Sequence, residues 1–171
     1  GVTVVSGFAQ GIDSAAHQGA LRGRGRTLAV LGSGLGVVPS GQRELAEEVA
    51  NRGALLSELR PMTPPSGPTL MARDRIISGL SRGVLVVEST TDSGTMDTVE
   101  RARKQGRLLW AVDWPEWEER HSGNHALLKG GASRVSPEVV LDEVDEICAS
   151  LQAFELPVPE DDAPRQMSLF A

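Results

Sequence analysis

The sequence has very little cysteine and no long apolar run, and each shortage excludes a class of protein. Its 171 residues include one cysteine, Cys148, so no disulfide can form within the chain. A single thiol fits a reducing compartment, and we expect a cytoplasmic protein. The longest apolar runs, such as residues 84–87, are far too short to span a bilayer, and we see no signal peptide. The sequence therefore predicts a protein with no membrane partner.

Residues that commonly hold metals or perform catalysis are also sparse. His17, His121 and His125 have no companions at metal-ligand spacing, so we expect no metal site. No nucleophile elbow and no convincing pair of catalytic carboxylates is present. The glycines at 32 and 34 do not complete a dinucleotide-binding fingerprint, and no acidic residue is placed to bind a ribose. These shortages favour a binding protein without a cofactor over an enzyme.

The overall charge is acidic, at −6 from 17 basic and 23 acidic residues. This balance counts against a protein that coats nucleic acid non-specifically, because such proteins are usually basic. The charges are unevenly distributed, since residues 60–82 carry +3 and residues 152–171 carry −3. A local basic stretch beside an acidic tail is compatible with a groove that binds phosphate.

Short β-branched runs alternate with segments of helical spacing along the chain. We expect strands at 2–5, 27–31, 54–57, 83–88 and 107–112, helices at 12–21, 43–52, 75–80, 95–105, 125–129 and 137–151, and a proline-rich loop at 61–68. This alternation implies right-handed crossovers and a Rossmann-like α/β fold, with a mainly parallel sheet and helices on both faces. We assign residues 1–151 to this core and 152–171 to a disordered acidic tail, which contains a linker at 155–165.

Small polar residues recur where the predicted strands end, which is where parallel sheets bind their ligands. They are Ser6, Gly7, Gly32, Ser33, Gly34, Ser93, Gly94 and Thr95. The last three also begin a helix, where free N–H groups and a hydroxyl can bind phosphate, although a simple capped turn explains them equally well. The tryptophans offer stacking surfaces for bases: Trp114 and Trp117 lie in a predicted loop, and Trp110 is expected in the core.

Arg73 and Arg75 flank Asp74 near the start of a predicted helix. Arginine binds phosphate through two parallel hydrogen bonds, so the pair is a candidate for DNA contact. The alternative is a solvated pair of arginines bridged by Asp74. The residues alone favour neither interpretation.

Four ordered segments together resemble the DprA/Smf family of DNA-processing proteins. They are residues 5–13 with Ala16 and His17, residues 27–35, residues 73–81, and residues 86–89 followed by 93–95. The resemblance spans about residues 1–151 and implies single-stranded DNA binding in natural transformation and recombination, homodimerisation, and delivery of the strand to RecA. It also implies that the contacts to DNA and its phosphates come from Ser6, Gly7, Gly32, Ser33, Gly34, Arg73, Arg75, Ser93, Gly94 and Thr95.

The sequence departs from the family pattern at residues that bear on DNA binding. The family's first strand and its Gly-Ser-Arg turn are absent, so we expect the chain to begin inside the domain. Val38 stands where the family has a tyrosine, Asp74 replaces an asparagine, and Asp113-Trp114 replaces Pro-Gly. These differences predict weakened or altered DNA binding.

Two further resemblances concern other partners. The turn at 93–95 also resembles that of the LOG-type nucleoside-monophosphate phosphoribohydrolases, in which case Asp97 and Glu100 would stabilise an oxocarbenium-like transition state. The double glycine of those enzymes is absent, and Asp97 also suits the first turn of a helix. Residues 166–170 resemble the peptide that docks on the DNA polymerase sliding clamp, with Gln166, Leu169 and Phe170 as anchors, although a chance match at a frayed end remains the alternative.

Overall fold

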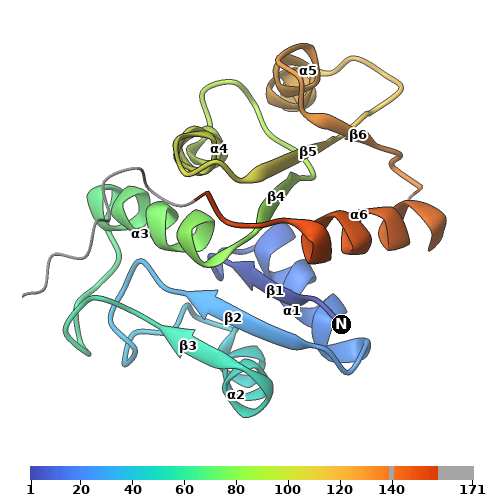
Figure 1. The fold of residues 1–171 in the computed structure, drawn as a ribbon. Helices are drawn as coiled ribbons and strands as arrows, with labels where there is room; N and C mark the ends of the chain where they lie inside the picture. The colour runs from blue at the N-terminus through green and yellow to red at the C-terminus, as the bar shows by residue number, and fades with distance from the viewer. Residues whose placement is uncertain (139–140, 158–171) are drawn as a thin grey trace, which may run out of the picture.

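The computed structural model describes residues 1–138 and 141–157, in which strands and helices alternate (Figure 1). The elements are β1 (Thr3–Ser6), α1 (Ile12–Arg22), β2 (Arg26–Val30), α2 (Arg43–Arg52), β3 (Ala54–Leu56), α3 (Gly67–Leu80), β4 (Gly83–Val86), α4 (Gly94–Lys104), β5 (Leu108–Val112), the 3-10 helix η1 (Glu119–His121), α5 (Ser122–Lys129), β6 (Ser133–Val135) and α6 (Leu141–Ala153). Most of the predicted linker and the peptide with Gln166, Leu169 and Phe170 lie outside the described residues.

The strands form two parallel sheets of three strands each, in the orders β1-β2-β3 and β4-β5-β6. The predicted α/β class with parallel strands is confirmed. Strand pairing among the described residues does not join β1 to β4, so two sheets take the place of one continuous sheet. Helix α3 links the two halves, because it packs on α4 from one half and on β1 and β2 from the other.

The strand order determines where the helices lie. Helix α1 connects β1 to β2, and α2 connects β2 to β3, so both connections move across the first sheet in the same direction. Right-handed crossovers therefore place both helices on the same face of that sheet. They pack against each other and against that sheet. Helix α3 follows β3 and runs back across the sheet toward β1, which is the opposite direction. It therefore covers the other face of the sheet. These crossovers bring the carboxyl ends of each sheet's strands to one edge, where the predicted polar turns lie.

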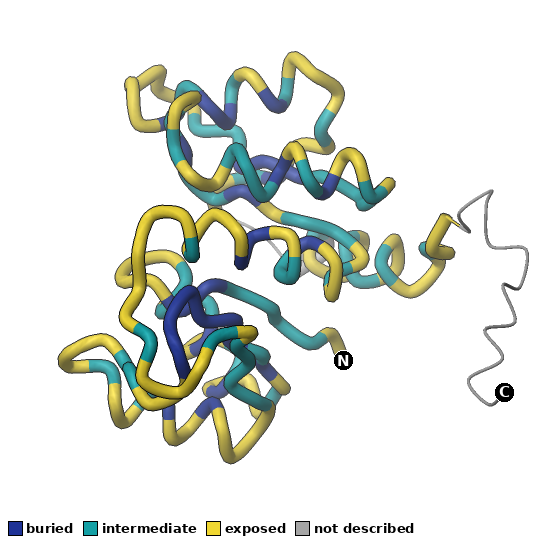
Figure 2. Tube along the Cα trace, turned by 90° about the vertical axis from the view of Figure 1, so that its left-hand side faces the viewer, coloured by how far each residue is buried: buried dark blue, intermediate teal, exposed yellow. Residues whose placement is uncertain are grey.

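Each half of the molecule has its own hydrophobic core. The first core contains Phe8, Leu21, Ala29, Leu31, Ala46 and Val49, and the second contains Val86, Val99, Ala111 and Leu127. Burial is concentrated on the strands and on the inward sides of the helices, while the outer turns are exposed (Figure 2). The turns at the strand ends are therefore anchored by packed elements on both sides.

Helix α3 begins well before the predicted start at residue 75. Ser66 caps it, and its side chain and that of Thr69 exchange hydrogen bonds with each other's backbone N–H groups in a capping box. Pro68, which we assigned to a loop, lies in the first turn, where its missing N–H needs no acceptor. The proline-rich composition of residues 61–68 thus concealed the helix start.

Further elements differ from expectation: helix α5 begins at Ser122 and not at residue 125, and the 3-10 helix η1 was not predicted. Strand β6 was not predicted, because it has three residues and no alternation of apolar and polar side chains; it forms by pairing with β5. Helix α6 begins at Leu141 and not at residue 137. In the described part of the chain, none of the helices has the length and apolar character needed to cross a membrane.

Candidate nucleic-acid interface

The turn after β1 is held by hydrogen bonds within the protein. The hydroxyl of Ser6 donates to the carboxylate of Asp13, and the backbone N–H of Ala9 donates to the same carboxylate at 3.1 Å. Further along α1, His17 is fully buried and its Nδ1 lies 2.6 Å from the hydroxyl of Thr27. The sequence placed Ser6 at the phosphate site, but here its hydroxyl is committed to the start of α1.

Arg73 lies beneath this turn and is almost completely buried, with 8% of its surface exposed. Its Nη1 donates to the carbonyl of Gly7 and, at 2.6 Å, to the carbonyl of Val30, and its Nε donates to Asp74 at 3.0 Å. The side chain therefore ties α3 to the carboxyl ends of β1 and β2. Gly7 is required for this contact, because a Cβ at this position would lie 2.2 Å from Nη1.

Asp74 shares this buried environment. Burial raises the pKa of its carboxyl above the ordinary value, and the charge of Arg73 opposes that effect. Asp97 and Arg101 of α4 also act on the pKa of Asp74, in opposite directions. The pair Arg73–Asp74 is thus neither solvated nor open to a ligand, and it is packed against the carboxyl ends of β1 and β2.

The glycine turn after β2 also serves packing. The hydroxyl of Ser33 donates to the carbonyl of Val37 at 2.8 Å, and the N–H of Gly34 donates to Thr63 at 2.8 Å. A Cβ on Gly34 would lie 2.0 Å from the carbonyl oxygen of Arg60, and one on Gly32 would lie 2.6 Å from Leu70. The predicted turn is present, but its glycines admit neighbouring protein segments.

The turn before α4 is the most open of the predicted phosphate sites. Ser93 occupies the cap position without accepting a hydrogen bond from the helix backbone, and its hydroxyl lies 2.6 Å from that of Ser89. Apart from the adjoining residues of the helix, nothing lies within 4 Å of the position that a Cβ on Gly94 would take, and both Gly94 and Thr95 are exposed. Because first-turn N–H groups have no acceptor within a helix, this end of α4 can donate to an anion.

Acidic residues lie close to this open turn. The hydroxyl of Thr90 donates to exposed Asp92 at 2.6 Å, and this bond lowers the pKa of the Asp92 carboxyl. Arg75, the remaining predicted ligand, forms an ion pair with Glu58, and both side chains are about half exposed. A phosphate at α4 would therefore depend mainly on backbone N–H groups.

The structure also reveals a residue that the sequence analysis missed. Asn124 of α5 is buried, and its Nδ2 donates to the carbonyls of Val86, Val87 and Val112 at 3.2, 2.9 and 3.1 Å. It thereby fixes the carboxyl ends of β4 and β5 beside the α4 turn. The sequence offered no clear signal, because Asn124 directly precedes the predicted helix at 125–129, where asparagine is an ordinary capping residue.

The loop after β5 is held against the same region by an aromatic stack. Trp114 donates its indole N–H to the carbonyl of Val87 at 2.8 Å and stacks on His121, with ring centroids 4.9 Å apart. His121 in turn lies 3.5 Å from the carboxylate of Glu88. Of the two loop tryptophans, only Trp117 is freely accessible, with 71% of its surface exposed. Trp110 is buried, as predicted.

The carboxylates required for the hydrolase alternative are both engaged in ion pairs along α4. Asp97 accepts from Nε of Arg101 at 2.6 Å, and Glu100 accepts from Nζ of Lys104 at 2.6 Å. Each pair joins residues one helical turn apart, as in an ordinary stabilised helix. This arrangement favours a helix-stabilising role for both carboxylates.

Comparison with known proteins relates this chain to a family of DNA-processing proteins. The family model of DNA recombination-mediator protein A matches residues 1–149. Protein Smf of Escherichia coli (strain K12) is 43% identical over 147 residues, which cover 84% of this chain and 39% of that protein. DNA processing protein DprA of Streptococcus pneumoniae (strain ATCC BAA-255 / R6) is 40% identical over 136 residues, covering 79% of this chain and 48% of that protein. The chain spans less than half the length of these relatives.

Two solved structures share the fold. The X-ray structure of DprA from Streptococcus pneumoniae superposes with a TM-score of 0.75 at 36% identity, over 91% of this chain and 52% of that one. DprA from Helicobacter pylori, solved to study its single-stranded DNA binding mode, superposes with a TM-score of 0.75 at 25% identity, over 90% of this chain and 67% of that one. From the family match and the identities to Smf and DprA, the chain belongs to the DNA recombination-mediator protein A (DprA/Smf) family.

Proposed function

We propose that this protein binds single-stranded DNA at the carboxyl ends of its strands, with the N-terminus of α4 as the phosphate site. The observation that supports this most directly is the open turn at Ser93 and Gly94, where a helix begins without a side-chain cap and with free space above the backbone. The N–H groups there can bind a phosphate without reading sequence. The single-stranded DNA binding of the Helicobacter pylori relative points to the same ligand.

We infer a smaller set of direct DNA contacts from the burial and hydrogen bonding of the predicted residues. Gly94 and Thr95 remain as direct contacts, together with Ser93 and, after release from Glu58, Arg75. The other predicted contacts, namely Ser6, Gly7, Gly32, Ser33, Gly34 and Arg73, act by shaping and anchoring the turns. Binding would then be sensitive to salt, because backbone phosphate contacts release counterions.

The wider role follows from family membership and is part of the same proposal. The protein would act in natural transformation and recombination in the cytoplasm, as a homodimer that delivers single-stranded DNA to RecA, without catalysing a reaction. Gln166, Leu169 and Phe170 would add a contact to the sliding clamp. Loss of clamp pull-down on changing Leu169 and Phe170 to alanine is the result expected for that contact, and unchanged pull-down would rule it out.

The decisive experiment uses Gly94→Asp, because this change separates DNA binding from folding. An aspartate in the first turn of a helix stabilises it, and the structure has room for the side chain. The same carboxylate would occupy the phosphate position and repel DNA. We expect fluorescence anisotropy with oligo-dT at low salt to show strong loss of affinity, while thermal unfolding is unchanged or improved. Gly94→Asn is the neutral control, and equal affinity of all three proteins would exclude this site.

A further inference from the structure

A cluster of arginines lies at the other edge of the first sheet, away from the candidate site. Arg22 ends α1, Arg24 and Arg26 lie in and after the turn that leads into β2, and Arg52 ends α2. All of them are exposed. Residues 14–43 contain no aspartate or glutamate, although the chain has 23 acidic residues. We refer to Arg22, Arg24, Arg26 and Arg52 as the arginine edge.

The fold brings the two ends of this cluster together. Nη1 of Arg52 lies 3.5 Å from the carbonyl oxygen of Leu21, directly before Arg22. Gly53 packs so closely on the start of β2 that a Cβ there would lie 1.7 Å from the carbonyl oxygen of Thr27. The arginines therefore form one surface, although Arg52 is distant from the others in the sequence.

The arginine edge is not neutralised by the protein. Within residues 1–138 and 141–157, no carboxylate forms an ion pair with any of its members. At the candidate site, by contrast, Arg75, Arg120 and Arg134 are each paired with a carboxylate. The arginine edge is thus a cluster of positive charge without ion pairs in the described part of the chain, at the opposite end of the strands from the candidate site.

The backbone at Arg24 indicates that its charge matters. Helix α1 ends in a Schellman motif, in which the N–H of Gly25 donates to Ala20 and the N–H of Arg24 donates to Leu21. Arg24 has a φ of 55°, at the position that is usually glycine because a side chain is strained there. Glycines flank it on both sides, so the arginine occupies the place where a glycine would be more stable.

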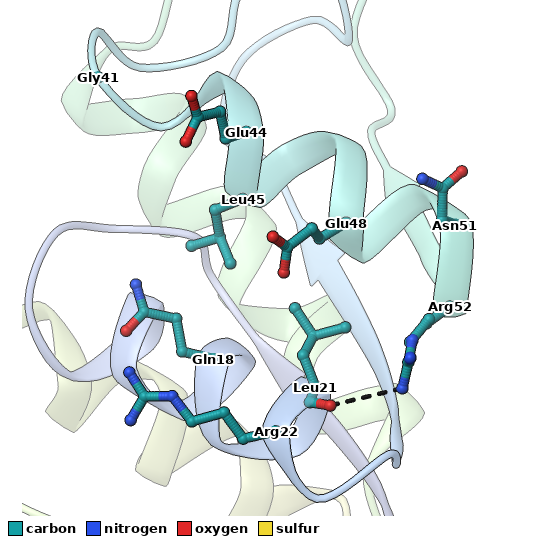
Figure 3. Close-up of a pocket in the computed structure, with 9 residues that line it drawn as sticks. All are labelled: Gln18, Leu21, Arg22, Gly41, Glu44, Leu45, Glu48, Asn51 and Arg52. Carbon is teal, nitrogen blue, oxygen red and sulfur yellow. Dashed lines mark hydrogen bonds between the residues drawn. The ribbon is translucent and has the colours of Figure 1, made fainter.

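A groove between α1 and α2 continues from the arginine edge (Figure 3). It has a volume of about 590 Å³, and Leu21 and Leu45 line it together with the amides of Gln18 and Asn51. Arg22 and Arg52 line the groove from opposite sides, with the guanidinium of Arg22 beside Gln18, and Glu44 and Glu48 of α2 line it as well. An anionic chain would therefore follow the arginines and not the full length of the groove.

We propose that the arginine edge is a second contact for the phosphate backbone of single-stranded DNA, distinct from the α4 turn. Guanidinium groups bind phosphate through paired hydrogen bonds, and a positively charged surface follows the backbone of a single strand without reading its sequence. A strand held at both edges would bind more tightly than one held at a single edge, provided that it is long enough to span them. This inference rests on the proposed function, since it takes the same ligand.

The test compares a short oligo-dT of about 6 nucleotides, able to occupy one site, with one several times longer. The variant Arg24→Gly/Arg26→Gln removes two charges and places the favoured glycine in the turn, so the fold is preserved or stabilised. Arg103→Gln/Lys129→Gln is the charge-matched control, since both residues are exposed and without ion pairs in the described part of the chain. The salt slope is the slope of the logarithm of the DNA-binding constant against the logarithm of the salt concentration. Two lost phosphate contacts reduce its size by about 1.4. A fourfold rise in salt should therefore weaken DNA binding by the wild-type protein about sevenfold more than binding by the variant.

The outcomes separate the two proposals. Loss of the advantage of the long oligonucleotide, in this variant and not in the control, supports the arginine edge. If the variant keeps the DNA affinity and the salt slope of the wild-type protein, the arginine edge is overturned and the α4 site still stands. The same holds if the variant and the control lose equal affinity, because such a loss would reflect net charge alone. Failure of the wild-type protein to bind either oligonucleotide would overturn the proposed function together with this inference.

Discussion

Replacing Arg73 by alanine distinguishes an internal anchor from a phosphate ligand. The buried guanidinium donates to the carbonyls of Gly7 and Val30 and to the carboxylate of Asp74. Alanine leaves the two carbonyls without this donor and leaves Asp74 as a buried charge without its cation. Breaking a buried ion pair by removing one partner costs about 3–5 kcal/mol, and we expect the free energy of unfolding to fall by that amount.

Urea unfolding followed by tryptophan fluorescence measures this change. With an m value of about 2 kcal/mol per molar urea, the midpoint should fall by about 2 M. Arg73→Lys keeps the charge but lacks the planar fork that reaches three acceptors, so it should restore only part of the loss. A loss below about 1 kcal/mol, as for an exposed ion pair, would refute the anchor, above all if the salt dependence of DNA binding fell at the same time.

The companion variant Asp74→Asn should change the pH dependence of stability. Since burial raises the pKa of Asp74 above 3.8, the folded protein keeps its proton to a higher pH than the unfolded chain does. Stability therefore falls as the pH rises from 3.8 through the folded pKa, and the penalty is fully present at neutral pH. Asparagine removes this pH dependence but leaves Arg73 without its counter-charge, so the stability of the variant relative to the wild-type protein should be lowest below pH 3.8 and rise toward pH 7. Combined with Arg73→Ala, it should recover part of the lost stability.

Three further predictions follow from the strand ends and the first core. Burial lowers the pKa of His17 below 6.5, so the unfolded chain takes up a proton first and stability falls as the pH drops below that value; His17→Gln should remove this slope in urea unfolding. Asn124→Ala should lower the free energy of unfolding by about 2–3 kcal/mol, because three carbonyls lose a donor, and an unchanged midpoint would contradict that role. Gly34→Ala should cost about 1–3 kcal/mol because its methyl group meets the backbone of Arg60, whereas Gly94→Ala, in open space, should cost nothing in the same thermal unfolding assay.

Much of the architecture was predictable because it depends on local pattern. The apolar run at residues 83–88 and the β-branched run at 2–5 identify strands β4 and β1, and the spacing of Leu45 and Val49 identifies α2. Strand β6 was not predictable, since three residues carry no periodicity and depend on β5 for their pairing. The start of α3 was concealed because proline serves equally in a loop and in the first turn of a helix.

The candidate site shows the same limit more sharply. Sequence identifies turns rich in serine and glycine at strand ends, and the structure places them there. It does not tell whether a glycine makes room for a ligand, as at Gly94, or for protein, as at Gly7 and Gly34. It likewise cannot tell whether an arginine faces solvent or is buried under a turn, as Arg73 is.

The sequence by itself therefore determined the class of fold, the order of most of its elements and the family to which the chain belongs. These follow from hydrophobic periodicity and from motifs that are each continuous in the chain. Tertiary structure alone decided which polar groups are already satisfied, which cations are neutralised, and which distant residues form one surface, as Arg52 does with Arg22 and Arg26. The physical reason is that hydrogen bonds, ion pairs and burial depend on contacts between segments far apart in the sequence.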